Sequence, residues 1–171
     1  MSKAMIVRGA DEQILPYGTV LTTHAFNYGT GRLDAIYGKG DVLALTQPLW
    51  PSLRSMIMRY RNELETFVFV GHGEQNKGIV INDSPTQSLM TPGWLNLPGG
   101  PLHVSYVYLY ACYQGANPLR QNWINNLGCM PKYFHGYESA KIALTLDPAY
   151  VRFFDAISMA RTLGVEREYH A

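Results

Sequence analysis

Two side chains of this sequence have the chemistry of a nucleophile and a base, and each follows an apolar run. His72 comes after Thr66–Val70 and a single glycine, and Cys112 comes directly after the run 104–111. Both runs have the composition of buried strands, and the carboxyl ends of parallel strands are where sites form in open α/β sheets. A thiol, with a pKa of about 8.5, becomes a nucleophile once a base favours its thiolate. The spacing therefore predicts that Cys112 is a nucleophile and that His72 is its general base.

Glycines flank both residues. Gly73 follows the histidine, and Gly115 lies three residues after the cysteine. Glycine leaves backbone N–H groups accessible, so we expect the amides of Gly73 and Cys112 to stabilise an oxyanion. We expect Gly115 to permit the tight turn that keeps the thiol exposed.

The two blocks FVFVGHG (67–73) and VYLYACYQG (107–115) resemble the signatures of the caspase-like cysteine peptidases of clan CD. In that clan a hydrophobic strand leads into His-Gly, and a later one leads into Ala-Cys with a glycine nearby. The segments GIVIND (78–83) and 136–157 follow in the order seen in CHAT domains, so the resemblance covers about residues 41–164. It implies a cysteine endopeptidase that acts on protein or peptide substrates through a Cys-His dyad and an acyl-enzyme, without a cofactor.

The resemblance is closest to CHAT and metacaspase-like domains, because Gly115 lies three residues after the cysteine. Metacaspases have an aspartate two residues before the cysteine, where this chain has Tyr110, so a basic specificity cannot be transferred. The glutamine of the caspase block is also missing. The loop after the next strand forms one wall of the substrate pocket in caspase-like folds. Tyr110, Tyr137 and Glu138 are therefore the candidate substrate-binding residues, and the preferred substrate residue stays open.

Other interpretations compete with this one. His135 repeats the His-Gly pattern, although it follows the cysteine strand, and Cys129 has the setting of a structural thiol. The chain could also be an inactive caspase-like binding or assembly module. A further alternative is another Cys-His α/β hydrolase or acyltransferase, a class that usually has glycine before the nucleophile, where this chain has Ala111.

The remaining patterns predict a single domain, 1–171, with a mostly parallel α/β sheet flanked by helices, and the resemblance implies that this is a three-layer caspase-like fold. We expect residues 1–40 to be irregular, with short strands at 6–7 and 19–22 and a turn at 28–31. Later we expect a doubly buried strand at 41–46, a helix from Ser52 as N-cap to Glu65, a hairpin strand at 78–83, a strand at 133–137, and a helix over 149–163 that stops at Gly164.

Composition argues against some classes of binding partner for this protein. Fourteen basic and thirteen acidic residues give a net charge of +1, with no basic cluster, which argues against nucleic-acid binding. The longest apolar runs are far shorter than a membrane span, and no secretory signal is visible, so we expect a cytoplasmic protein with no membrane partner. Neither a disulfide framework nor a metal-ligand spacing is present. A homodimer or a regulatory partner is left open.

Overall fold

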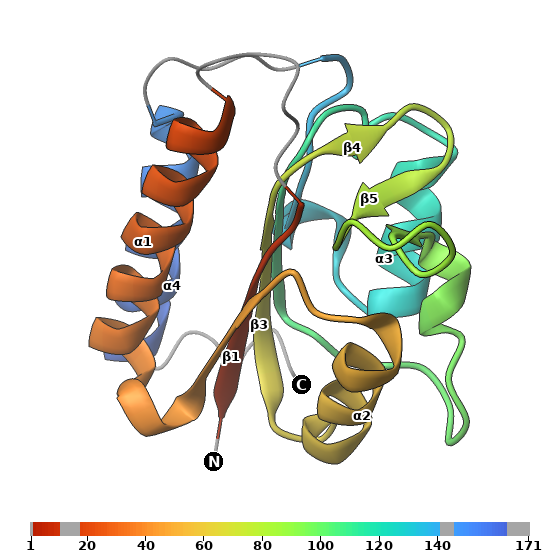
Figure 1. The fold of residues 1–171 in the computed structure, drawn as a ribbon. Helices are drawn as coiled ribbons and strands as arrows, with labels where there is room; N and C mark the ends of the chain where they lie inside the picture. Colours follow the sequence, from red (N-terminus) through yellow and green to blue (C-terminus); the bar gives the residue numbers. More distant parts are fainter. Residues whose placement is uncertain (1, 11–17, 141–145, 164–171) are drawn as a thin grey trace.

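A computed structural model shows a three-layer α/β fold, in which helices cover both faces of a parallel sheet (Figure 1). It describes residues 2–10, 18–140 and 146–163. The strands are β1 (Lys3–Arg8), β2 (Val42–Thr46), β3 (Leu64–Val70), β4 (Gly73–Glu74), β5 (Gly78–Val80), β6 (Leu89–Met90), β7 (Tyr106–Tyr110) and β8 (Phe134–His135). The α-helices are α1 (Gly18–Tyr37), α2 (Trp50–Tyr60), α3 (Leu119–Leu127) and α4 (Pro148–Leu163).

The central sheet has five strands in the order β2-β1-β3-β7-β8, and every neighbouring pair is parallel. The chain first moves outward from β1 to β2 and then crosses back to β3 on the other side of β1. This reversal makes the carboxyl ends of β1 and β3 a topological switch point, where ligand sites form in doubly wound sheets. The prediction of an α/β fold with a mostly parallel sheet flanked by helices is confirmed.

Alternating side chains of the central strands fill two separate cores. Phe67, Phe69 and Leu109 belong to one core, and Val68 and Tyr108 belong to the other. Helices α2 and α3 cover one face of the sheet, and α1 and α4 cover the opposite face (Figure 1). Every residue of β3 is buried, as expected of a central parallel strand. The predicted strands at 66–70, 104–111 and 133–137 correspond to β3, β7 and the shorter β8.

A second, antiparallel sheet of β4, β5 and β6 follows β3 directly. The predicted hairpin strand at 78–83 corresponds to β5, which ends at Val80. The side chain of Asn82 is buried and holds the next turn, because its Nδ2 donates to the carbonyl of Pro48 at 2.8 Å and to that of Gln87 at 2.9 Å. This small sheet fixes the segment that follows His72.

The strand predicted at 6–7 lies inside β1, but the rest of the N-terminal region differs from the prediction. Residues 19–22 and 28–31 lie inside the twenty-residue helix α1, not in a strand and a turn. Ala25, Gly29, Leu33 and Tyr37 recur every fourth residue and are all buried, so this face of the helix packs on the sheet. Tertiary packing of that stripe outweighs the low helix propensity of the glycines.

Three further predictions need correction. The predicted strand at 41–46 corresponds to β2, but this is an edge strand whose Ala44 and Thr46 are exposed, so it is not buried on both faces. Helix α2 begins at Trp50 rather than after an N-cap at Ser52, and it ends at Tyr60 because the chain turns there into β3. Helix α3 was not predicted at all.

Helix α4 matches the predicted 149–163, and Gly164 lies outside the described residues. None of the helices in the described ranges is long and apolar enough to cross a membrane.

Candidate active site

His72 and Cys112 follow adjacent strands at the same edge of the sheet. Val70 of β3 pairs with Tyr110 of β7, and the amide of Gly71 donates to the carbonyl of Tyr110 at 3.1 Å. Each of the two candidate residues lies two positions beyond that pair, and each is half-buried. The sheet therefore places the two residues that the sequence singled out at the same edge, after adjacent strands.

Gly73 lies directly against the backbone of Cys112. A β-carbon at position 73 would be 2.2 Å from the Cys112 carbonyl oxygen and 3.0 Å from the Cys112 nitrogen. The amide of Val80 donates to the carbonyl of His72 at 3.0 Å, so positions 72 and 80 form a hydrogen-bonded pair of the hairpin. By the alternation of antiparallel ladders, the N–H of Gly73 points away from β5. An outward N–H beside Cys112 is the arrangement that an oxyanion site needs.

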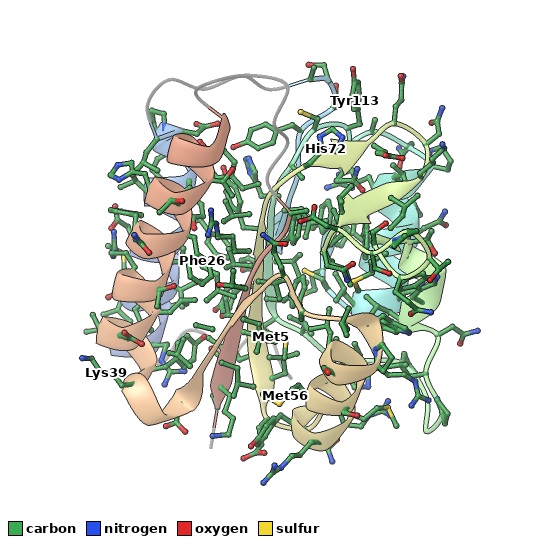
Figure 2. All side chains as sticks on the ribbon, in the orientation of Figure 1. Met5, Phe26, Lys39, Met56, His72 and Tyr113 are labelled. Carbon is green, nitrogen blue, oxygen red and sulfur yellow. The ribbon has the colours of Figure 1, made fainter. Side chains whose placement is uncertain are left out.

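The turn after Cys112 holds a tyrosine in an unusual conformation. Tyr113 has a φ of 68°, in the left-handed region that non-glycine residues seldom adopt. Its amide donates to the carbonyl of Ser139 at 3.2 Å, and the amide of Gly115 donates to that of Tyr137 at 2.8 Å. Such a conformation costs about 1–3 kcal/mol and is found mainly at functional sites. Figure 2 shows Tyr113 and His72 at the same end of the sheet.

Gly115 serves a different purpose from the one expected. A β-carbon there would be 2.3 Å from the carbonyl oxygen of Gly136, so the glycine permits the cysteine turn to pack on the segment after β8. Its amide bonds to that same segment. The close approach, and not a left-handed backbone, explains the glycine.

The segment after β8 thus lies beside the candidate nucleophile, and it carries two of the three candidate substrate-binding residues. Glu138 is exposed between Tyr137 and Ser139, whose carbonyls bind the cysteine turn. The ring of Tyr137 instead packs against Tyr108 and Tyr110. Glu138 is therefore accessible at the rim of the site, whereas Tyr137 has contacts of its own inside the protein.

Tyr110 belongs to the same aromatic cluster on the α4 side of the sheet. The hydroxyls of Tyr108 and Tyr137 are 2.6 Å apart, and that of Tyr137 donates to Asp147 Oδ2 at 2.8 Å. The hydroxyl of Tyr110 accepts the Asp147 N–H at 3.1 Å. Burial raises the pKa of all three tyrosines, and the hydrogen bond with Tyr108 and the charge of Asp147 raise that of Tyr137 further. These hydroxyls keep their protons near neutral pH and join β7 to the start of α4.

His135, the competing histidine, lies elsewhere. It pairs in register with Tyr108, four residues before Cys112, and its ring stacks on the Tyr108 ring with centroids 4.3 Å apart. At about 3.3 Å per residue, the register separates it from the level of Cys112 by roughly 13 Å. The contact favours a packing role for His135.

Cys129 is a buried thiol whose sulfur lies 3.3 Å from the carbonyl oxygen of Met130. Burial raises its pKa to about 12, which keeps it protonated and unreactive. Cys112 likewise forms no disulfide, but it is partly exposed. Across the part of the chain that the structure describes, no three His, Cys, Asp or Glu side chains gather closely enough to hold a metal ion.

Two residues of the site were missed at the level of sequence. Tyr113 and the fully buried Gln114 form the turn between the cysteine and Gly115. The only signal for Gln114 is an amide side chain inside a block of apolar strand and glycine turn. That signal does not say which carbonyls the amide binds.

Comparison with known proteins adds no relative: no protein-family model, curated protein or solved structure matches this chain.

Proposed function

We propose that this chain is a caspase-like cysteine endopeptidase, in which Cys112 is the nucleophile and His72 the general base. The observation that carries the proposal is the close packing of Gly73 on the Cys112 backbone, next to a β3–β7 register that brings His72 level with the cysteine. The resemblance of the two sequence blocks to clan CD supports the same assignment. The topological switch point beside β3 supports it as well.

The reaction follows from the chemistry of these groups. His72 takes the thiol proton, and the sulfur of Cys112 attacks the substrate carbonyl carbon, forming a C–S bond while an electron pair moves to the oxygen. The amides of Gly73 and Cys112 donate to that oxygen. When the C=O bond re-forms, the C–N bond breaks and the amine takes the proton from His72. Water, deprotonated by His72, then attacks the thioester, the C–S bond breaks, and the sulfur recovers a proton.

The proposed substrate is a protein or peptide, with Glu138 as the accessible candidate for a contact with it. Tyr110 and Tyr137 would then stabilise the site without contacting the substrate, because their hydroxyls already bind Asp147. Two cysteines without a disulfide are what a reducing compartment maintains, so a cytoplasmic location is part of the proposal.

The test is peptide hydrolysis on a positional-scanning library, combined with labelling by a thiol-directed peptide inhibitor. Cys112→Ala should abolish both hydrolysis and labelling, a loss of at least about 10³-fold, since a missing nucleophile removes the covalent route. Cys129→Ala is the matched control, because it removes the other thiol and should leave the rate unchanged. Full labelling of Cys112→Ala would reject the assignment. A wild type that cleaves no library peptide would favour an inactive binding module instead.

A further inference from the structure

Gln114 is a completely buried amide in the turn after the proposed nucleophile. Its relative exposure is 0%, and an amide without hydrogen-bond partners is strongly disfavoured in such a place. Its hydrogen bonds therefore decide how the surrounding backbone is arranged.

The amide nitrogen of Gln114 points at three backbone carbonyls from two different parts of the chain. Nε2 is 2.9 Å from the carbonyl oxygen of Cys112, 2.9 Å from that of Gly78 and 3.3 Å from that of Glu74. Glu74 and Gly78 are the paired residues of β4 and β5 that come directly after the Gly73–Ile79 pair. One NH₂ group thus ties the cysteine turn to the hairpin that carries Gly73.

The other side of the amide is fixed by helix α3. The Nε1–H of Trp123, a fully buried side chain, donates to Gln114 Oε1 at 3.0 Å. Because the oxygen is used in this way, the NH₂ group must face the three carbonyls. The orientation of the amide is therefore determined by its surroundings.

Gly73 lies inside this junction. A β-carbon at position 73 would be 2.9 Å from Gln114 Nε2 as well as in contact with the Cys112 backbone. The two amides that we assign to the oxyanion, those of Gly73 and Cys112, come from the two segments that Gln114 holds together. Beyond the last β3–β7 hydrogen bond, between Gly71 and Tyr110, Gln114 binds both the hairpin and the cysteine turn, so its hydrogen bonds contribute to the spacing of these two amides.

We propose that Gln114 is the positioning residue of the oxyanion site and sets the distance between the Gly73 and Cys112 amides. The inference rests on the proposed peptidase function. Gln114 acts through the backbone and not on the thiol, so its loss should weaken stabilisation of a tetrahedral oxyanion and leave the intrinsic reactivity of Cys112 nearly unchanged.

The experiment compares Gln114→Met, which keeps the size of the side chain and removes its donors, with wild type. Hydrolysis should show kcat reduced by about 10²-fold, near the effect of losing one oxyanion donor, with KM within about threefold. Affinity for a peptide aldehyde, which forms a tetrahedral adduct, should fall at least about 30-fold. Alkylation of Cys112 by iodoacetamide, which forms no oxyanion, should stay within about threefold of the wild-type rate.

Asn82→Leu is the matched control, since Asn82 is another buried amide whose bonds go to Pro48, Ser84 and Gln87 and to neither oxyanion segment. It should lower the thermal midpoint without changing the ratio of aldehyde affinity to alkylation rate. If Gln114→Met does not fold, Trp123→Phe, which frees only the Oε1 side, should change that ratio in the same direction by a smaller factor.

The outcomes separate the two proposals. An active wild type with an unchanged ratio in the folded variants would overturn the role of Gln114 alone. A wild type that neither cleaves peptides nor binds aldehydes would overturn the peptidase proposal and this inference together.

Discussion

Gly73 has no room for even one methyl group, and Gly73→Ala is the perturbation that best tests the geometry of the site. An added β-carbon would be 2.2 Å from the Cys112 carbonyl oxygen, whereas ordinary contact begins at 3.4 Å. The two segments must then separate by about 1.2 Å, the difference between these distances. The backbone of Gly73 is not in the left-handed region, so steric contact is the only obstacle to alanine.

This displacement lets us estimate both the loss of unfolding free energy and the loss of kcat. Inserting a methyl group into a packed interior costs about 1–3 kcal/mol of unfolding free energy. Misplacing a catalytic group by about 1 Å reduces kcat about 10²-fold. Since the methyl group also pushes on Gln114, we expect the loss of activity to exceed what the loss of stability alone would cause.

The assay is urea unfolding for stability together with peptide hydrolysis for kcat. Gly31→Ala is the matched control, because Gly31 lies in α1 with nothing within 4 Å of its added β-carbon. That variant should be more stable by up to about 1 kcal/mol and equally active. If Gly73→Ala unfolds and reacts like wild type, the close packing of Gly73 on Cys112 is wrong, and so is the oxyanion site built on it.

Two further predictions concern stability. Arg161→Ala should lower the free energy of unfolding in urea by about 2–4 kcal/mol, because it leaves Glu65 buried and charged after loss of their 3.1 Å ion pair. A double variant, Glu65→Leu with Arg161→Met, should lose less stability, because it leaves no buried charge unpaired. Equal losses in the two variants would contradict this reasoning. The pKa of Cys129 is about 12 in the native state, because of burial, and about 8.5 in the unfolded chain. Between these values the unfolded chain loses the proton first, so stability should fall as pH rises. The loss should reach up to about 2 kcal/mol between pH 8.5 and 10. Cys129→Ala should flatten that slope in unfolding curves recorded over the same range, and an unchanged slope would assign the loss to other groups.

Local sequence patterns predict part of the fold. The nearly continuous apolar runs at 66–70 and 104–111 correspond to β3 and β7, because strands buried on both faces consist mostly of apolar residues. The order of these strands and the residues that follow them were enough to single out His72 and Cys112. The i, i+4 stripe of α1, from Ala25 to Tyr37, was also present, but its glycines indicated a turn when read locally.

Other features exist only once the chain is folded. Whether the strand at 42–46 is central or at an edge depends on the order of the sheet, which its own apolar sequence does not contain. The parallel pairing of β3 with β7 is what places His72 and Cys112, forty residues apart in the chain, at the same edge of the sheet. His135 carries the same dipeptide as His72, yet its register places it in an aromatic stack instead of beside the thiol.

The sequence therefore predicts the Cys-His pair from residue types and from their positions at the ends of two strands. What only the tertiary structure decides is the junction around that pair, in which Gly73 of the hairpin meets Cys112 and Gln114 of the cysteine turn. The physical reason is that a buried amide and a close backbone contact are set by partners distant in sequence, so no local pattern specifies them.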